Sequence, residues 1–313
     1  MTSTLPAAAS SPGDLIAPRP RAHSGAPPTA SGGTIRTGIL WMLAATCLFV
    51  CQDSTARILL EAYPVTEVAF ARYFVHMVLV SAFLAWRDPR LMVSCRPLLQ
   101  ILRSSFLLSA TLFGMFALKI MPLADFTAIV WVAPVLVAAL SVFVLHEKVS
   151  PSVWVSVVAG LLGVWVIVGK TGMNFSLTML FPCLAALGNA LYQIATRLLH
   201  SADSSITTLF YTAIAGVLFC GGLLPFGAIA PDLSGAGLMF LLGLTGVVSH
   251  FCLIRAFAAA PANIIAPFGY ASLLWATLFG LLIFAEIPGP RTLAGAGLIA
   301  GAGLFVFLRG PKT

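Results

Sequence analysis

The chain has 313 residues, of which 59% are hydrophobic and only 9% are charged. Soluble globular domains average about 25% charged residues, so this composition excludes an ordinary soluble protein. The net charge of +7 comes from Lys and Arg residues that stand singly between apolar runs, which is typical of membrane proteins and argues against a nucleic-acid partner.

The N-terminal segment, residues 1–35, is rich in Pro, Ala, Ser and Gly. Such a composition buries too little apolar surface to form a core, so we expect a disordered cytoplasmic tail. The segment has no apolar stretch long enough for a signal peptide. We therefore expect the first hydrophobic run after it to stay in the protein as a helix.

Apolar runs of about 20 residues, the length that a bilayer-spanning helix needs, follow one another from residue 37 onward. The runs are continuous, whereas a membrane β-barrel would show short alternating segments. We therefore predict an all-α membrane protein with ten transmembrane helices. The predicted spans are 37–59, 66–86, 98–118, 123–145, 152–169, 176–197, 205–226, 235–255, 262–285 and 291–309.

The distribution of Lys and Arg predicts the orientation of the chain. Ten spans put both termini on one side, and most basic residues, Arg103 among them, then fall on that side. The opposite side holds only Lys119, Lys170 and Arg291. Because basic loops stay inside the cell, we expect both termini to be cytoplasmic.

The two halves of the sequence resemble each other. The segment FALKIMPLADFTAIVWVAPVLVAALSVFVLHEKVSP aligns with RAFAAAPANIIAPFGYASLLWATLFGLLIFAEIPGP. Pro122 and Glu147 recur as Pro261 and Glu286 at a constant offset of about 139 residues, which indicates an internal repeat. Glu147 and Glu286 stand at loop junctions, where we expect them to accept hydrogen bonds from helix ends.

Each half, residues 37–170 and 176–309, contains five predicted spans. Five is an odd number, so the two halves must have opposite orientations in the membrane. Inverted repeats of this kind are typical of secondary transporters, in which the substrate site lies near the midplane between the halves.

Two pairs of motifs resemble a known family. ALKIMPLADFTAIVWVAPV followed by LHEKVSP, and FGYASLLWATLFGLLIFAEIPG followed by AGAGLIAGAGLF, are similar to the drug/metabolite transporter superfamily in its ten-helix form with two EamA repeats. The resemblance covers about residues 37–309. It implies a bacterial inner-membrane transporter that carries a small polar organic metabolite by alternating access, with no cofactor and no metal. The second half departs from the pattern, because no basic residue follows Glu286 and Leu273 stands opposite Pro134.

The stretch QDSTARILLEAYPVTEVAFARYFVHM is similar to family members assigned to riboflavin uptake, which makes riboflavin the leading expectation. Members assigned to amino-acid export or to S-adenosylmethionine uptake share much of this stretch, so such a metabolite is the alternative. A membrane-embedded enzyme or a lipid translocase is the alternative from another class. The sequence contains no GxSxG, no HExxH and no Walker loop, so we do not expect an enzyme.

Ionisable residues in the first two spans are the first candidate site. Asp53 and Arg72 each lie about six residues from the outer end of their span, or roughly 9 Å inside it. Neighbouring antiparallel helices would bring them to one depth, where a salt bridge is expected. The pair could pin the hairpin, contact substrate, or do both. Arg57 is shallower and is expected to extend outward to the interface.

Polar side chains on one helix face are the second candidate site. His76 follows Arg72 by four residues and shares its face. It could be a packing residue or a ligand or proton carrier, and the same alternatives hold for His250. The sixth span carries Asn189, Tyr192 and Gln193 as one stripe, which indicates either a central cavity or interhelical hydrogen bonding.

Aromatic residues within the spans complete the candidate set. Trp131, Tyr211, Tyr270 and Trp275 lie inside spans instead of at their ends, which suits stacking on a planar ring or ordinary packing. Pro134 and Pro267 lie inside the fourth and ninth spans and predict kinks. The predicted substrate-binding residues are Gln52, Asp53, Arg72, His76, Trp131, Asn189, Tyr192, Gln193, Tyr211, His250 and Tyr270.

Overall fold

The computed structural model describes residues 32–144, 151–168, 180–199, 202–259 and 266–309. The tail predicted over residues 1–35 lies almost entirely outside these ranges. Within them the chain forms helices and no strand. The α-helices are α1 (Gly32–Ala62), α2 (Val65–Arg87), α3 (Pro97–Leu118), α4 (Leu123–Val130), α5 (Ala133–Val144), α6 (Pro151–Val168), α7 (Leu180–Leu199), α8 (Ser205–Tyr211), α9 (Ile214–Leu223), α10 (Leu233–Ala259), α12 (Ala271–Phe284) and α13 (Pro290–Arg309), and the 3₁₀ helices are η1 (Pro89–Met92), η4 (Leu224–Phe226) and η5 (Ala266–Tyr270).

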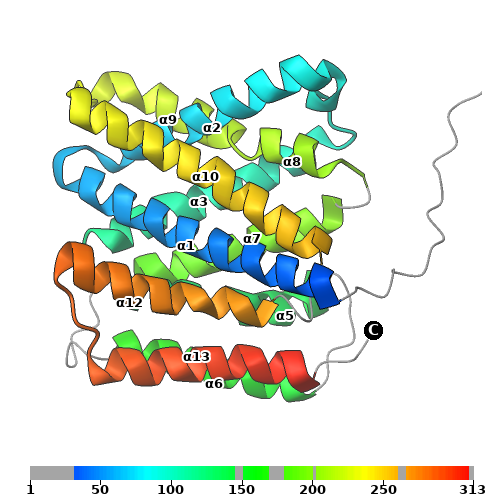
Figure 1. Cartoon of the computed structure of the whole chain (residues 1–313), viewed down its shortest axis with the longest axis vertical. Helices are drawn as coiled ribbons and strands as arrows, with labels where there is room; N and C mark the ends of the chain where they lie inside the picture. Colours follow the sequence, from blue (N-terminus) through cyan, green and yellow to red (C-terminus); the bar gives the residue numbers. More distant parts are fainter. Residues whose placement is uncertain (1–31, 145–150, 169–179, 200–201, 260–265, 310–313) are drawn as a thin grey trace, which may run out of the picture.

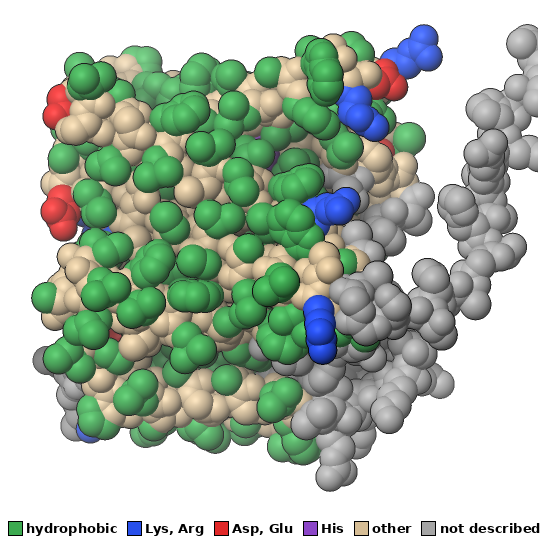
Figure 2. Space-filling model, in the orientation of Figure 1, with side chains coloured by type: hydrophobic (Ala, Val, Ile, Leu, Met, Phe, Trp, Pro, Cys, Tyr) green, Lys and Arg blue, Asp and Glu red, His purple; other side chains and the backbone are tan. Residues whose placement is uncertain are grey.

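The long helices have the length and composition of membrane spans. Helices that are long and apolar enough to cross a membrane are Ile35–Ala62, Val65–Arg87, Pro97–Leu118, Ile206–Phe226 and Leu233–Ala256. Shorter apolar stretches cover Leu123–Val137, Val157–Ile167, Leu180–Thr196 and Phe268–Phe284. Apolar side chains cover the middle of the face in Figure 2, and charged side chains gather towards its left and right margins. Hydrocarbon around the middle of the molecule accounts for this distribution.

Three of the predicted spans are interrupted. The fourth is divided into α4 and α5, the seventh into α8, α9 and η4, and the ninth into η5 and α12. Pro134 falls in the first turn of α5, where its missing N–H costs no hydrogen bond, and the interruption precedes it. Pro267 lies in η5. The sequence therefore predicted two of the three irregularities, and it missed the one between α8 and α9.

The packing of the helices links distant parts of the chain. Helix α1 packs along α10 and α12 and lies between them in Figure 1. Helix α3 packs along α7, α2 packs on α9, and α4 packs on α12. Helices α6 and α13 pack on each other at one edge of the molecule. Helix α1 begins and α13 ends on the same, right-hand side of Figure 1.

The contact between α6 and α13 depends on two glycines. A Cβ on Gly163 would lie 2.8 Å from the carbonyl oxygen of Gly295, and a Cβ on Gly295 would lie 2.6 Å from that of Gly163. The two backbones therefore approach too closely for any side chain. Gly297 and Gly301 of the same last helix have nothing within 4 Å of an added Cβ.

We expect Gly163→Ala to destabilise the protein and Gly297→Ala to leave it unchanged. The first change inserts a methyl group between two backbones, and overpacking of this kind typically costs about 1–3 kcal/mol. The second adds the same methyl group in open space and is the matched control. Thermal unfolding of both variants in detergent measures the difference, and equal unfolding temperatures would contradict the close crossing.

Candidate functional site

The polar residues of α1 lie near the middle of that helix. Gln52 is buried, and its Nε2 donates to the carbonyl oxygen of Leu242 on α10 at 3.2 Å. A Cβ on Gly246 would lie 2.4 Å from this Nε2, so the glycine leaves room for the amide. Gln52 therefore joins α1 to α10 through a hydrogen bond, and it is a packing contact as well as a predicted substrate ligand.

The salt bridge predicted between Asp53 and Arg72 is not formed. Among the described residues the one ion pair within 4.0 Å joins Arg57 to Glu286. Asp53 and Arg72 are both half-buried and close enough to interact electrostatically. Equal depth places two residues at one level of the membrane, but the rotation of each helix decides whether their side chains meet. The structure thus leaves two opposite charges near each other and not bonded.

The two histidines pack among rings. His76 is buried, and its Nε2 lies 3.2 Å from the carbonyl oxygen of Leu209 on α8. A carbonyl oxygen only accepts, so the Nε2 is the donor of this hydrogen bond. The ring centroids of His76 and His250 are 6.3 Å apart, and Phe49 meets His250 edge-on at 5.1 Å. These contacts favour the packing alternative for both residues.

The polar stripe predicted on α7 is present. The Nε2 of Gln193 donates to the Oδ1 of Asn189 at 3.5 Å, and both residues are half-buried. Tyr192 lies between them in the sequence, and the guanidinium of Arg103 sits 4.8 Å from the centroid of its ring. This contact brings α3 against the stripe through a residue that was not among the candidates.

Arg103 was counted among the basic residues of the inner side, and its burial was not predicted. It lies in α3 and its side chain is completely buried. Its Nη2 donates to the carbonyl oxygen of Thr208 at 2.5 Å and to the Oγ1 of Thr212 at 2.7 Å, while its Nε donates to the Oε1 of Gln100 at 3.3 Å. An arginine within an apolar run was the sequence signal for this network.

The interruption between α8 and α9 is held by the same part of α3. The hydroxyl of Ser104 donates to the carbonyl oxygen of Thr212 at 3.1 Å and accepts from the N–H of Ala215 at 3.0 Å. Arg103 satisfies the carbonyl of Thr208 in the same turn. Backbone groups in hydrocarbon must find protein partners, and here side chains from another helix supply them.

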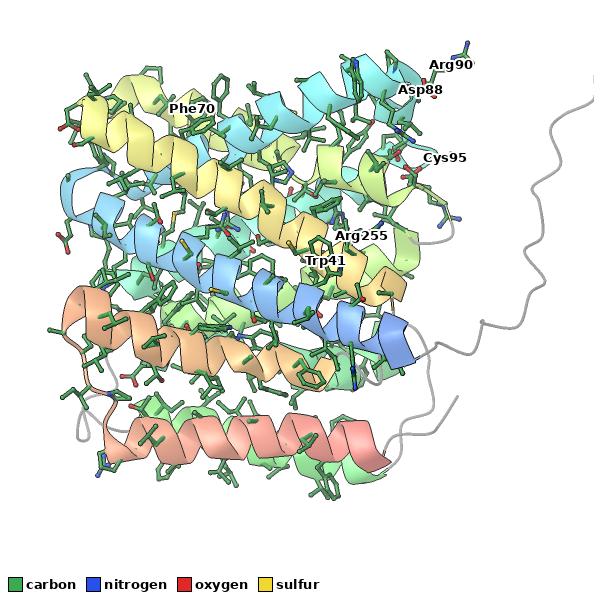
Figure 3. The ribbon with its side chains drawn as sticks, in the orientation of Figure 1. Trp41, Phe70, Asp88, Arg90, Cys95 and Arg255 are labelled. Carbon is green, nitrogen blue, oxygen red and sulfur yellow. The ribbon has the colours of Figure 1, made fainter. Side chains whose placement is uncertain are left out.

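Asp203 closes the network at the right-hand end of the molecule, where Cys95 lies in Figure 3. It accepts from the Oγ of Ser94 at 2.5 Å, from the N–H of Cys95 at 2.8 Å and from the Nε2 of Gln100 at 2.8 Å. Burial raises the pKa of Asp203, but these three donors outweigh it and hold the pKa below its ordinary value. The carboxylate thereby ties the loop before α3 to the loop before α8.

A second carboxylate ties the opposite end. Nη1 and Nη2 of Arg57 donate to Oε2 and Oε1 of Glu286 at 2.8 and 2.6 Å, and the N–H of Leu123 donates to Oε2 at 3.1 Å. Arg57, which was expected to extend outward to the interface, thus pairs with a carboxylate two residues beyond the end of α12. The predicted hydrogen bond from a helix end to Glu286 is confirmed, because Leu123 is the first residue of α4. Its counterpart, Glu147, lies outside the described residues.

The hydrogen bonds around Glu286 favour the ionised form of its carboxyl group. Ala285 adopts a left-handed conformation with φ of 54°, which ends α12 and turns the chain at this point. Burial raises the pKa of Glu286, but the bonds from Arg57 and Leu123 outweigh it and hold the pKa below its ordinary value of 4.5. The carboxylate of Glu286 is therefore ionised at neutral pH, and its negative charge pairs with the guanidinium of Arg57.

The aromatic candidates fall into two places. The rings of Trp131 and Tyr270 lie 5.5 Å apart with an angle of 49° between their planes. A Cβ on Gly269 would lie 2.6 Å from the Trp131 ring, so the glycine admits this contact. Tyr211 ends α8 and packs edge-on against Phe210 at 5.5 Å. The structure thus joins Trp131 to Tyr270, at the point where α4 ends and η5 leads into α12.

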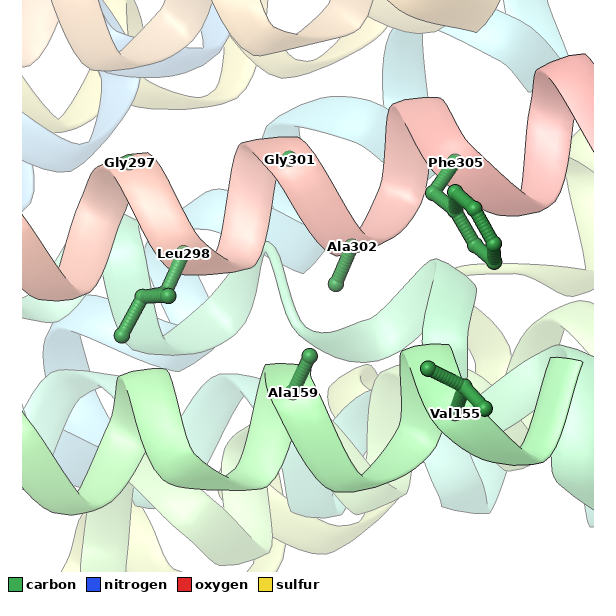
Figure 4. Close-up of a pocket in the computed structure, with 7 residues that line it drawn as sticks. All are labelled: Val155, Ala159, Gly297, Leu298, Gly301, Ala302 and Phe305. Atoms are coloured by element: carbon green, nitrogen blue, oxygen red, sulfur yellow. The ribbon is translucent and has the colours of Figure 1, made fainter. Parts of the chain in front are cut away.

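A surface groove runs between α6 and α13 (Figure 4). Its volume is about 230 Å³, which is below the roughly 300–1,000 Å³ of typical small-molecule sites. Its lining contains none of the predicted substrate-binding residues and is mostly apolar. The lining residues are Val155, Ala159, Gly297, Leu298, Gly301, Ala302 and Phe305. In the part of the chain that is described, no cluster of His, Cys, Asp or Glu could hold a metal ion.

Comparison with known proteins places the chain in a family. The model of the EamA-like transporter family matches twice, over residues 36–169 and 176–308. The S-adenosylmethionine uptake transporter of Rickettsia bellii is 29% identical over 283 residues, which cover 90% of this chain and 96% of that protein. The riboflavin transporter of Vibrio cholerae is 26% identical over 281 residues, covering 86% of this chain and 92% of its own.

Two further similarities extend this result. The pseudopaline exporter CntI of Pseudomonas aeruginosa is 24% identical over 271 residues, with 86% of this chain and 95% of the exporter covered. A solved crystal structure superposes with a TM-score of 0.61 at 17% identity, covering 88% of this chain and 96% of the other, which shows a shared fold. With the family model matched over most of its length, the chain belongs to the EamA-like transporter family and is a membrane-embedded, multi-pass transporter.

Proposed function

We propose that this transporter takes up S-adenosylmethionine, or a metabolite of the same chemistry, across the bacterial inner membrane. Four relatives named for S-adenosylmethionine uptake are 27–29% identical over 90% of the chain. Relatives named riboflavin transporters are 25–27% identical over 80–86% of it. Riboflavin, which the sequence favoured, is therefore less well supported than the alternative that the sequence left open.

The observation that carries this proposal is the unbonded pair of opposite charges at Asp53 and Arg72. Ionisable groups within a membrane protein pair with each other or face a cavity or substrate. S-adenosylmethionine carries a sulfonium, an ammonium and a carboxylate group. Asp53 can bind one of its cationic groups and Arg72 its carboxylate. Riboflavin is uncharged and offers neither charge a partner.

Alternating access between two inverted halves is the mechanism we propose. The helix contacts support a two-fold relation between residues 37–170 and 176–309. Helix α1 packs on α10 as α7 packs on α3, and α6 packs on α13, its own counterpart in the repeat. We count α4 and α5, α8 and α9, and η5 and α12 as single spans, which gives the ten spans of this proposal. An even number puts both termini on one side, and the excess of basic residues there favours the cytoplasm.

Side-chain hydrogen bonds join the two halves at both ends of the molecule. Arg57 of the first half binds Glu286 of the second at one end, and Gln100 of the first half binds Asp203 of the second at the other. Alternating access requires that such contacts open on one side at a time. We propose that these two carboxylates are the contacts that break and re-form during transport.

The experiment is uptake of radiolabelled S-adenosylmethionine by bacteria that lack such uptake and express the full chain. We expect accumulation above the empty-vector control, with competition by unlabelled S-adenosylmethionine and none by riboflavin. Accumulation of labelled riboflavin instead would replace this proposal with the runner-up. Absence of S-adenosylmethionine uptake at normal abundance in the membrane would overturn it.

A further inference from the structure

Four buried polar atoms stand without a hydrogen-bond partner in the described part of the chain. They are the Oγ1 of Thr127, the Oη of Tyr270, the Oγ of Ser272 and the Nε1 of Trp275. Thr127 belongs to α4, Tyr270 to η5, and Ser272 and Trp275 to α12, which packs on both α4 and η5. Buried polar groups are nearly always bonded, so four exceptions on three neighbouring elements require an explanation.

Helix chemistry does not explain the unpaired hydroxyls. A serine or threonine in a helix can donate to the carbonyl three or four residues earlier, and this is the common pattern in this chain. Hydroxyls that do so are those of Thr46, Ser54, Thr55, Thr245 and Ser249. Thr127 is only 4% exposed and Ser272 only 2%, yet neither makes this bond. Their hydroxyls remain available to a ligand.

The unpaired atoms accompany aromatic rings at interruptions of the helices. Thr127 precedes Trp131 by four residues, which puts both on one side of α4. Ser272 and Trp275 are three residues apart on α12, directly after Tyr270. The ring of Tyr270 lies 5.5 Å from that of Trp131. Transporters commonly bind their substrates where spanning helices are interrupted.

We propose that these residues form a subsite for a planar, nitrogen-containing heteroaromatic ring. The rings of Trp131 and Tyr270 provide aromatic surface for stacking. The indole N–H of Trp275 only donates, so the ligand must present an acceptor, and the three hydroxyls can donate or accept. Ring nitrogens and an exocyclic amino group or carbonyl meet both requirements. The inference rests on the proposed function in one respect, namely that the ring is part of the transported metabolite.

Two sources of such a ring fit this chemistry, the adenine of S-adenosylmethionine and the isoalloxazine of riboflavin. The experiment measures dissociation constants of adenosine, S-adenosylmethionine and riboflavin for the purified full chain, by quenching of tryptophan fluorescence. If the ring is adenine, adenosine and S-adenosylmethionine should bind tightly and riboflavin should not. If it is isoalloxazine, riboflavin alone should bind tightly. Failure of both to bind the unchanged protein would overturn the subsite.

The test variants each remove one unpaired atom and little else: Trp275→Phe, Tyr270→Phe and Ser272→Ala. Each is expected to weaken binding of the ring by about three- to tenfold, the worth of one hydrogen bond. Their thermal stability without ligand should stay equal or rise, because no bond of the empty protein is lost. Tyr73→Phe is the matched control, since the Oη of Tyr73 lies 3.2 Å from the Leu107 carbonyl oxygen and 2.6 Å from the Thr111 Oγ1.

The control is expected to lose stability without ligand and to keep its affinity. If Tyr270→Phe and Ser272→Ala lose stability as Tyr73→Phe does, the four atoms have protein partners and the subsite does not exist. If affinity is unchanged in all three variants, the atoms bind only ordered water, and the proposal is likewise overturned. The two proposals can fail separately. If the unchanged protein does not take up S-adenosylmethionine but binds a ring, and the variants weaken that binding, the subsite is retained and the proposed function is rejected.

Discussion

Replacement of Asp53 by Asn should lower kcat/KM for S-adenosylmethionine uptake by at least about 30-fold. The change keeps the shape of the side chain and removes its charge. A buried charge that loses its partner on a ligand typically costs about 2–5 kcal/mol, and 2 kcal/mol corresponds to about 30-fold. Glu61→Gln, at the exposed end of the same helix, is the control and should keep full uptake.

Arg72→Gln separates the roles of the two charges. If Arg72 binds the substrate carboxylate, the variant should lose the preference for S-adenosylmethionine over its decarboxylated analogue. Asp53→Asn should keep this preference, because both compounds retain their cationic groups. Competition of each compound against labelled S-adenosylmethionine measures the preference. An unchanged preference in Arg72→Gln would show that the two residues do not divide the substrate between them.

Loss of the contact between Arg57 and Glu286 should destabilise the protein at neutral pH. Glu286→Gln removes the carboxylate that binds Arg57 and the N–H of Leu123. Hydrogen bonds to charged groups contribute about 1.5–3 kcal/mol, and the side chains are 20% and 23% exposed, so we expect about 1–2 kcal/mol after screening. Thermal unfolding in detergent at pH 7 measures the difference.

The pH dependence of this difference follows from the lowered pKa of Glu286. A carboxyl whose pKa is lower in the folded state stabilises the protein fully above its unfolded pKa, near 4.5. That contribution is lost as the pH falls through the lowered, folded value. The gap between the unchanged protein and Glu286→Gln should therefore be constant from pH 7 to about pH 5 and close at more acid pH. A gap that persists in strong acid would show that the charge has no part in it.

The sequence predicted the helical class and most of the elements, because the length of an apolar run is sufficient to identify a membrane span. It missed the interruption at Thr212 and Ala213, since the apolar composition continues through it. It also missed Arg103, whose partners come from a distant part of the chain. Such partners depend on how helices pack, which the pattern of a single helix does not determine.

For the candidate site the sequence predicted which residues lie near each other better than which of them bond. Asp53 and Arg72 lie near each other, as their positions in the two spans suggested, but without contact. Arg57 was placed near the end of its helix and found a partner in Glu286, 229 residues away. Trp131 and Tyr270 were predicted as separate aromatic residues, and the folded chain brings them together.

The dependence of the α8–α9 interruption on Arg103 and Ser104 has a consequence for how the protein is made. When α8 and α9 leave the ribosome, the partners of their open turn already exist on α3, which was synthesised earlier. A fragment beginning at residue 176 would bring that open turn into the bilayer with no partner for the Thr212 carbonyl or the Ala215 N–H. Produced alone it should be degraded, and co-expression of residues 1–175 as a separate fragment should restore both its abundance and transport.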